Sequence, residues 1–549
     1  MKISITQLKT YASIALMTLG VFGVMSTACA YSSYIPSGET AYQWSWGGKA
    51  AIMFSVCALV SILLSTKGIA YFHKSVIWGL ILIGGVEAIW GLRQIYGFAT
   101  SHHSLYAVTG SFFNPGPYSG YLALVFPICL HEWLSLNAIK HHTEIEKVTY
   151  FFSLGILLLL ISVLPAGMSR SAWIAAVVSG VLVCGIHYHW VEWLKKTWKM
   201  HRKRTTVIIC LLVICVLLSG FGIYTLKPDS AKGRLFMWKI SSLAISEKPF
   251  TGHGIGNFVQ AYGHAQESYF SAGNYSEAEE RVAGSPAYAF NEYFRIATEC
   301  GIPVLLVILI GIGYCFYHGI RYRRIGICGG ILSLLIFSFS SYPMEFPCFI
   351  FSLIFLLIAC LTERSRVLPI IFVLLIGAMG VRIVSINQYE ACRSWSQCRM
   401  LYDVHVYSRA NEEYNLLYPK LRDRSRFLFE YGRSLYNQKR YRASIIILKE
   451  ASEVSCDPMI LNVIAKNYLA LKEYEEAEKW LIRSTHLLPG RIYPYYLLAK
   501  LYAEPAYSHP EKLKYLAGIV LTKEPKVQST AIKEMREEIK SILRKSHFF

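Results

Sequence analysis

Two arginines, Arg170 and Arg234, lie close to long apolar runs of this 549-residue chain. Arg170 follows Ser169 where two apolar runs are separated by almost no loop, and Trp238 lies one helical turn after Arg234. A guanidinium group is planar, permanently charged and can bind two phosphate oxygens at once. Both residues also have a purely structural interpretation, because an arginine at the end of a span can extend to the membrane interface and an exposed arginine need contact nothing.

A run of alternating glycines, Gly252, Gly254 and Gly256, follows in the same polar segment and encloses His253. The run differs from a dinucleotide-binding motif, because no strand precedes it and no acidic residue follows at the required distance. It predicts a tight turn in which the backbone comes close to a ligand or a neighbouring helix. His253 is either a base or a residue of the turn.

The composition determines the class of protein, since 54% of the residues are hydrophobic and only 16% are charged. A soluble chain of this length seldom reaches such values. About eleven apolar runs are long enough to cross a bilayer, which predicts an all-α polytopic membrane protein. These runs lie near residues 8–30, 50–66, 75–92, 118–136, 148–168, 171–191, 206–225, 300–317, 325–342, 347–362 and 367–386. The first is either a retained span, which we favour, or a cleaved signal peptide.

Basic residues fall in alternate loops between these runs, which explains a net charge of +20 without nucleic acid. They are Lys67, Lys74, Lys140, Lys147, Lys195, Lys196, Lys199, Arg202, Lys203, Arg204, Arg321, Arg323, Arg324, Arg364 and Arg366. One orientation makes all of them cytoplasmic. The polar segment 229–299, the loop 93–117 and everything after Asn387 then lie on the far side of the membrane. In the loop 93–117, glycine, proline and Asn114 form either a surface turn or part of a site.

Short motifs in this order resemble the O-antigen ligase and polymerase superfamily (Wzy_C). They are Gly110-x-Phe112-x-Asn114, Ser169-Arg170, Gly233-Arg234, the glycine run 252–256, Asn291-Glu292-Tyr293 and Glu299-x-Gly301. Members of this superfamily move glycans from a polyprenyl-pyrophosphate carrier to an acceptor outside the cytoplasmic membrane. The resemblance covers about residues 91–301. It implies a bacterial inner-membrane protein with its chemistry and its C-terminal region on the periplasmic side.

The resemblance also implies roles for individual residues. Arg170 and Arg234 would hold the pyrophosphate, Asn291, Glu292 and Tyr293 would line the acceptor side, and Arg295 would add positive charge. Trp238 and Asn114 are further candidates for substrate contact. For Glu299, a structural role at the start of the next span is favoured.

One position departs from the family pattern. Ligases of the family place a histidine before the asparagine, whereas this chain has Phe290. A sugar on pyrophosphate already has a good leaving group, so stabilising the developing charge supplies much of the catalysis. The acceptor proton would then go to Glu292, His253 or His264. Phe290 equally leaves open a polymerase or an inactive relative.

No metal site and no cofactor are predicted. The chain lacks Asp-x-Asp, His-x-x-x-His and cysteine pairs at zinc spacing. Most of its 14 cysteines lie in apolar runs, where they act as small hydrophobic residues. Cys392 and Cys398 lie close together in a far-side segment, so a disulfide between them stays open, with free thiols slightly favoured.

The region 387–549 has a different composition and an internal period. Tyr431-Gly432, Ile464-Ala465 and Leu498-Ala499 recur at about the spacing of tetratricopeptide repeats. We expect a helical repeat domain, which either binds a protein partner in a concave groove or braces the polar loop.

The combined expectation is a membrane domain over 1–386 and a repeat domain over 387–549. Its activity would be metal-independent transfer of a glycan from undecaprenyl pyrophosphate to a hydroxyl of a lipid or protein acceptor. A polymerase of the same superfamily is one alternative. A non-catalytic scaffold that acts through its repeats is another.

Overall fold

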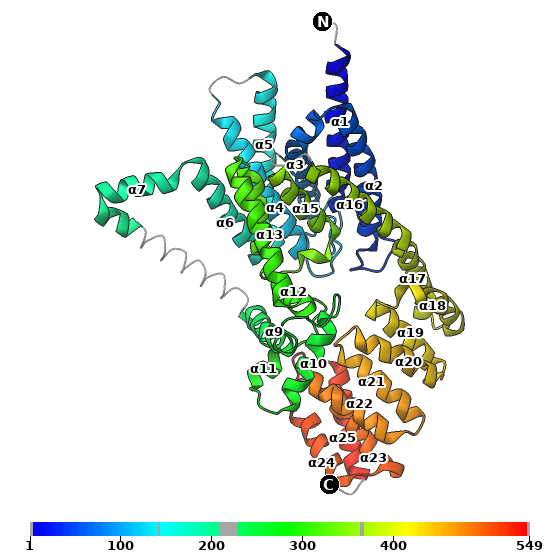
Figure 1. The fold of residues 1–549 in the computed structure, drawn as a ribbon. Helices are drawn as coiled ribbons and strands as arrows, with labels where there is room; N and C mark the ends of the chain where they lie inside the picture. The colour runs from blue at the N-terminus through cyan, green and yellow to red at the C-terminus, as the bar shows by residue number, and fades with distance from the viewer. Residues whose placement is uncertain (1–3, 140–142, 209–227, 363–366, 546–549) are drawn as a thin grey trace. The chain divides into compact units, whose positions relative to one another are not determined.

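The computed structural model describes residues 4–139, 143–208, 228–362 and 367–545, with side chains omitted at 228–230 and 367 (Figure 1). Every regular element within these residues is a helix, as predicted. The chain divides into two compact units, and each is considered by itself. Unit 1 comprises Met1–Leu226, Phe290–Tyr293 and Leu306–Arg393, and unit 2 comprises Lys227–Ala289, Phe294–Leu305 and Ser394–Phe549.

Unit 1 contains ten helices of the described residues, all of them apolar except α7. They are α1 (Ile5–Met25), α2 (Ala41–Leu64), α3 (Lys67–Ile95), α4 (Pro115–Asn137), α5 (Glu144–Val163), α6 (Arg170–His187), α7 (Trp190–Met200), α14 (Ile325–Ser338), α15 (Pro347–Leu361) and α16 (Val367–Ile386). The 3₁₀ turns η1 (Ser26–Cys29), η2 (Leu164–Gly167) and η3 (Pro343–Glu345) join them. Two further helices, α13 (Ile302–Arg321) and α17 (Gln388–Asp403), each run across a boundary between the units.

Eight helices of the described residues are long and apolar enough to cross a membrane, and they correspond to eight of the eleven predicted runs. They are Ile5–Cys29, Ala41–Leu64, Lys67–Ile95, Pro115–Asn137, Glu144–Gly167, Arg170–His187, Ile302–Arg321 and Leu368–Asp403. The runs expected at 325–342 and 347–362 form helices of 14 and 15 residues. Pro343 opens η3 and Pro347 opens α15, so the two helices stay separate. The run expected at 206–225 lies almost entirely outside the described residues.

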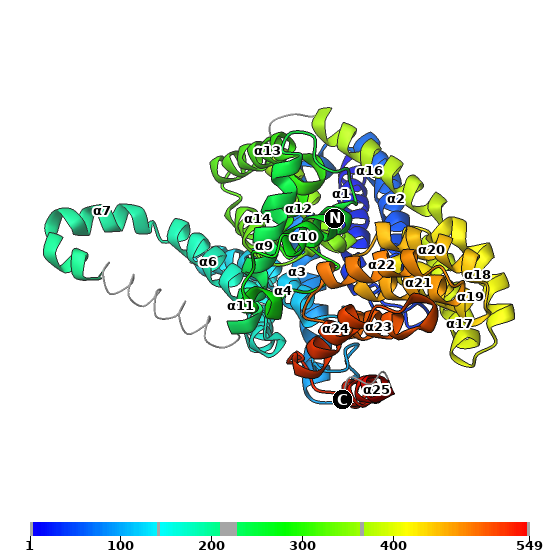
Figure 2. The same cartoon turned by 90° about the horizontal axis from the view of Figure 1, so that it is seen from below.

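Small residues allow the helices of unit 1 to pack closely. In this unit α1 lies beside α2 and α3, α16 beside α2, and α14 beside α4 and α6 (Figures 1 and 2). A Cβ on Gly380 would lie 2.7 Å from the carbonyl oxygen of Gly48, and a Cβ on Gly120 would lie 2.3 Å from the ring of Phe337. Glycine at such crossings brings membrane helices within van der Waals contact of each other.

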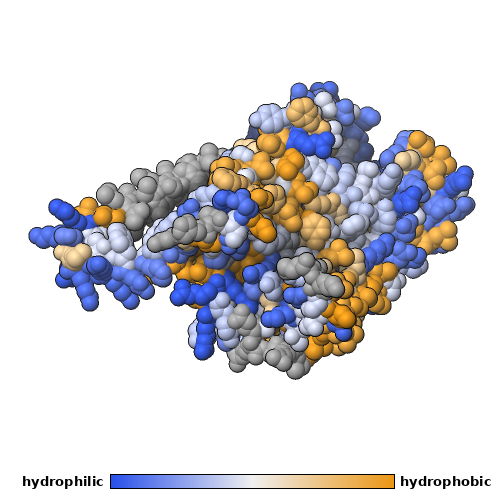
Figure 3. All heavy atoms as spheres, turned by 90° about the horizontal axis from the view of Figure 1, so that it is seen from above, coloured by the Kyte–Doolittle hydropathy of each residue, from blue (hydrophilic) through white to orange (hydrophobic). Residues whose placement is uncertain are grey.

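The outer surface of unit 1 keeps many large apolar side chains. Val307 and Ile310 on α13 are 69% and 71% exposed, and hydrophobic residues form broad orange areas in the space-filling view (Figure 3). In water such surface would be unfavourable, whereas lipid solvates it. This exposure agrees with a multi-pass membrane protein.

Unit 2 joins the polar segment to a C-terminal series of paired short helices. The polar segment forms α9 (Pro228–Glu247), α10 (Phe258–Ser271) and α11 (Glu277–Val282), and α10 packs against α9 and α22. The Nε2 of Gln266 on α10 donates a hydrogen bond of 2.7 Å to the carbonyl of Leu487. Residues of the polar segment and of the C-terminal region therefore belong to one packed body.

The C-terminal helices form a series of short paired helices. They are α18 (Tyr407–Leu421), α19 (Ser425–Asn437), α20 (Tyr441–Glu453), α21 (Pro458–Ala470), α22 (Tyr474–Leu487), α23 (Ile492–Ala503), α24 (Pro510–Thr522) and α25 (Thr530–Lys545). Gly432 lets α19 approach α20, since a Cβ there would lie 2.5 Å from Leu448. Cys398 is a free thiol whose Sγ donates to the carbonyl of Ala410, so the disulfide to Cys392 is not formed.

Candidate functional site

The start of helix α12 (Glu292–Cys300) places three of the predicted residues in unit 1. Asn291 precedes the helix, and its Oδ1 accepts a hydrogen bond of 3.0 Å from the backbone N–H of Tyr293. This is an N-cap interaction, which satisfies one of the free N–H groups of the first turn. The preceding Phe290 has a φ of +49°, and its ring lies 5.0 Å from that of Tyr342.

Glu292 is buried and its carboxylate is held by the backbone. The side chain is 4% exposed, and Oε1 accepts a hydrogen bond of 2.9 Å from the N–H of Met344 in η3. A buried carboxylate needs such donors, because burial removes the water that would otherwise solvate it. The contact fixes the position of the carboxylate in unit 1.

Tyr293 lines a cavity of about 390 Å³ between α6 and α14. The cavity is lined by Ser171, Ile174, Tyr293, Leu335, Ile336, Phe339 and Ser340. The hydroxyl of Tyr293 donates a hydrogen bond of 2.8 Å to the carbonyl of Leu335, and burial raises the pKa of Tyr293 to about 12. The phenol is therefore protonated at neutral pH and acts here as a hydrogen-bond donor.

Arg170 is the first residue of α6 and precedes Ser171, whose Oγ lies 2.6 Å from the Oγ of Ser340. The helix N-terminus carries partial positive charge, and a half-buried arginine adds a full charge to it. Backbone N–H groups and a guanidinium together favour an anion such as phosphate. The cavity in unit 1 is thus lined both by Tyr293 and by Ser171, which follows Arg170 in the chain.

In unit 2, the predicted residues of α9 lie beside the rest of α12. The ring of Trp238 stacks on that of Phe294 with centroids 6.0 Å apart, and Arg234 lies one turn before Trp238 on the same helix. Arg295 forms an ion pair with Glu299, with 3.4 Å between Nε and Oε1. The side chain of Glu299 thus orients an arginine, a structural role.

The glycine turn approaches helix α12 closely. A Cβ on Gly252, which has a φ of +67°, would lie 2.3 Å from the carbonyl oxygen of Glu299, and the N–H of Gly254 donates to the same carbonyl at 2.9 Å. The third glycine, Gly256, has a φ of +84° and open space around it. Of the partners predicted for this turn, the neighbouring helix is the one in contact with Gly252.

Three other predicted residues lie in different surroundings. His253 has its Nε2 2.8 Å from the carbonyl of Ala244, so this nitrogen carries the proton, because a carbonyl can only accept. His264 is exposed on α10. Asn114 caps α4, since its Oδ1 accepts a hydrogen bond of 3.0 Å from the N–H of Gly116.

Sequence reasoning missed the residues that shape the loop before α4. The Oε1 of Gln94 accepts hydrogen bonds of 2.8 Å from the N–H groups of Thr109 and Gly110, and Oε2 of Glu87 accepts one of 3.1 Å from Ser111. Glu87 is fully buried. Its position inside an apolar run was the available signal, because a carboxylate in a membrane span is usually functional or paired.

Within the part of the chain that the structure describes, no three His, Cys, Asp or Glu side chains gather as potential metal ligands.

Comparison with known proteins finds one family. Residues 155–309 match the family model described as O-antigen ligase (Wzy_C), and the matched segment includes Arg170, Arg234 and Glu292. A search of curated proteins finds no match.

Proposed function

We propose that the protein transfers a glycan from undecaprenyl pyrophosphate to an acceptor hydroxyl on the periplasmic side of the inner membrane, as a ligase or a protein O-oligosaccharyltransferase. The observation that carries this proposal is the family match over residues 155–309, which contains both arginines and the start of α12. The multi-pass helical fold agrees with a lipid-linked donor. The tandem helix pairs are compatible with a tetratricopeptide-like array that contacts an acceptor protein.

In the proposed reaction, the acceptor oxygen attacks the first carbon of the sugar from the side opposite the carrier. The bond between that carbon and the phosphate oxygen breaks, so the configuration inverts and the pyrophosphate leaves with the bonding electrons. Arg170 and Arg234 offset the negative charge that develops on the leaving group, which takes the place of a metal ion. Asn291 and Tyr293 line the acceptor side, and Arg295 adds positive charge.

Glu292 is the preferred base among the three candidates. Its carboxylate is held in place by Met344, and the next residue, Tyr293, lines the 390 Å³ cavity. The Nε2 of His253 is engaged with the carbonyl of Ala244, and His264 is exposed to solvent. On this proposal Glu292→Gln lowers transfer by about 10²- to 10⁴-fold, whereas His264→Gln leaves the rate unchanged.

A reconstituted assay tests the proposal. Purified protein is mixed with a short glycan on undecaprenyl pyrophosphate and candidate acceptors, with and without EDTA, and products are followed by mass spectrometry. We expect carrier pyrophosphate to be released and the glycan to appear on a new acceptor, both with and without EDTA. Loss of transfer in EDTA would contradict the metal-independent mechanism.

Phe290 supports polymerisation as a second candidate function, because it replaces the histidine that ligases of the family place before the asparagine. The same assay distinguishes the two activities, since a polymerase yields longer glycans that remain on the carrier. If neither product forms with a verified native donor, the enzyme proposal fails and a scaffold function takes its place.

A further inference from the structure

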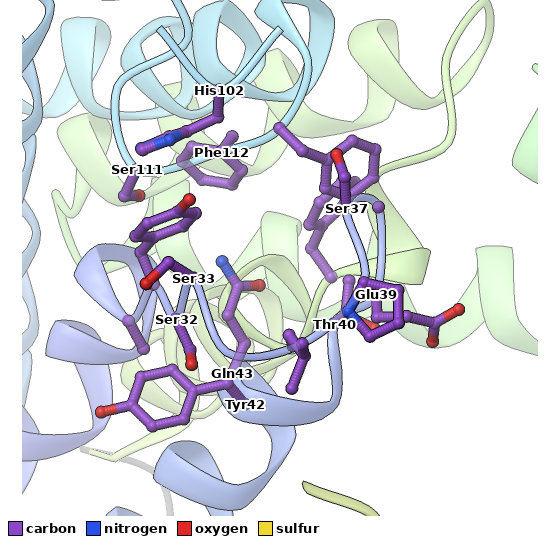
Figure 4. A pocket seen from close by; sticks show the side chains of 17 residues that line it. Ser32, Ser33, Ser37, Glu39, Thr40, Tyr42, Gln43, His102, Ser111 and Phe112 are labelled. Carbon is purple, nitrogen blue, oxygen red and sulfur yellow. The ribbon is translucent and has the colours of Figure 1, made fainter. Parts of the chain in front are cut away.

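A second cavity in unit 1 has no role in the proposed chemistry. It measures about 260 Å³ and lies between the segment from Ala30 to Gln43 and the loop that contains His102 and Ser111 (Figure 4). This volume is just below the roughly 300–1,000 Å³ of most small-molecule sites. The cavity is therefore large enough for a small ligand only.

Two polar side chains at this cavity have atoms without partners. Gln43 is 6% exposed, and Figure 4 shows its carboxamide directed into the enclosed space. Its Oε1 accepts no hydrogen bond from any described residue, and the same is true of Nε2 of His102. A buried polar atom without a partner is unfavourable, so the Gln43 oxygen favours a ligand with a hydrogen-bond donor, and the His102 nitrogen favours a group that can both donate and accept.

His102 is held rigidly in the wall of the cavity. Its ring stacks on Tyr31 with centroids 3.7 Å apart, and its backbone N–H donates to Oγ1 of Thr109 at 3.2 Å. Burial lowers the pKa of His102, which keeps the imidazole neutral at physiological pH. A neutral ring retains one nitrogen that can accept a hydrogen bond.

The lining disfavours an anionic ligand. The 17 described residues around the cavity include no lysine or arginine, and Glu39 is the one acidic residue among them. Phosphate recognition requires positive charge or convergent donors, so a phosphate group does not fit here. Besides the imidazole of His102, the other polar side-chain groups are hydroxyls and one carboxamide, supplied by Tyr31, Ser32, Ser33, Ser37, Thr40, Tyr42, Gln43 and Ser111. Aromatic rings of Phe112 and Phe113 complete the wall.

We propose that this cavity binds a neutral sugar residue. Ring hydroxyls both donate and accept, so they supply the hydrogen-bond partners that Gln43 and His102 lack, and the C–H faces of the sugar pack on the aromatic rings. A site built from polar groups of this kind rejects ligands without hydroxyls, because its own groups would then be left unpaired.

An aromatic run places this sugar site next to the start of α12. The ring of Phe113 lies 5.4 Å from that of Phe346, which lies 6.1 Å from Tyr342, and Tyr342 contacts Phe290 at 5.0 Å. All four residues belong to unit 1. Assigning the sugar to the transferred glycan or its acceptor rests on the proposed function, whereas sugar binding itself does not.

Saturation-transfer NMR on the purified full-length protein tests sugar binding. The probes are glucose, galactose, N-acetylglucosamine and N-acetylgalactosamine, each alone, with inorganic pyrophosphate as the charged comparison. We expect binding of at least one sugar and an affinity about tenfold lower in Gln43→Ala. Ser33→Trp, at an exposed position on the lining, blocks the cavity without altering a buried group. Gln528→Ala, at an exposed position in unit 2, is the matched control and leaves affinity unchanged.

The proposal is overturned if no sugar gives a signal. It is also overturned if the signals of the wild type, Gln43→Ala and Ser33→Trp are equal. A pyrophosphate signal that competes with the sugar would overturn it as well. If the sugars bind at this cavity while no donor supports transfer, the sugar site stands and the proposed function fails. If transfer proceeds while Gln43→Ala and Ser33→Trp bind every sugar normally, the proposed function stands and the sugar site fails.

Discussion

Both units bury hydroxyls against backbone carbonyls, and unit 2 also pairs charged side chains between its elements. In unit 1, buried hydroxyls donate to backbone carbonyls of neighbouring helices: Ser13 to Ser61 at 2.9 Å, and Ser333 to Ala123 at 2.6 Å. In unit 2, charged side chains pair across elements, as Arg483 does with Glu267 at 2.8 and 3.0 Å. Lipid cannot solvate an ion, so neutral short-range contacts suit the first unit. Water lowers the cost of charge in the second unit and equally weakens each ion pair.

Each unit has an arginine at its candidate site, and we expect replacement of these arginines to have the largest effect on glycan transfer. Arg170→Ala in unit 1 and Arg234→Ala in unit 2 should each lower glycan transfer by about 10²- to 10³-fold, because each removes charge stabilisation from the leaving group. Arg93→Ala and Arg281→Ala, at exposed positions of the same two units, serve as matched controls. Full activity in correctly inserted Arg170→Ala and Arg234→Ala proteins would refute the proposed roles.

The next largest expected effect is a loss of stability when close helix packing in unit 1 is disturbed. Gly380→Ala should destabilise the protein by about 1–3 kcal/mol, because the new methyl group would meet the backbone carbonyl of Gly48, which cannot rotate away. Gly311→Ala on α13 is the control, since nothing described lies within 4 Å of its Cβ position. Thermal unfolding in detergent measures both. Equal melting temperatures of Gly380→Ala and Gly311→Ala would mean that α2 and α16 pack less closely than described.

The ion pair between α10 and α22 gives a smaller effect in unit 2. Arg483→Ala should reduce stability by about 1 kcal/mol, because the pair has two parallel hydrogen bonds but the arginine side chain is 38% exposed. Lys479→Ala breaks a more exposed pair with Glu476 on the same helix and should change nothing measurable. Hydrogen exchange of α10 reports both variants. The difference in hydrogen exchange between the two variants should shrink in high salt. A difference that does not depend on salt would indicate that Arg483 acts through packing instead.

The smallest effect is a pH dependence within α9–α11. The hydrogen bond from Lys239, with help from the N–H of Ser276, lowers the pKa of Glu279 from 4.5 to about 2. Because the folded pKa lies below the unfolded one, the stabilisation is present above pH 4.5 and is lost as pH falls towards 2. Hydrogen exchange of α11, corrected for intrinsic rates, should show this loss in the wild type. Lys239→Met should flatten the profile, and an unchanged profile would exclude this ion pair as its cause.

Local patterns were enough to predict several features. Eight of the predicted apolar runs are helices of span length, and the period that begins at Tyr431 corresponds to a helix pair, α19 and α20. The turn at Gly252 was predicted as well. A neighbouring helix was one of its predicted partners, but which helix was not predicted, because the carbonyl of Glu299 lies almost fifty positions further along the chain and local sequence does not specify such contacts.

The sequence by itself determined the helical class, the membrane character and the order of the family motifs. These depend on hydropathy and spacing within short windows, which act before any tertiary contact forms. Only the tertiary structure decided that Tyr293 donates to Leu335, that Glu292 is fixed by Met344, and that Gln43 and His102 face one cavity. Each of these arrangements joins residues dozens of positions apart. Helix packing selects such partners by shape and by the need to satisfy buried polar groups, and neither is visible in a local pattern.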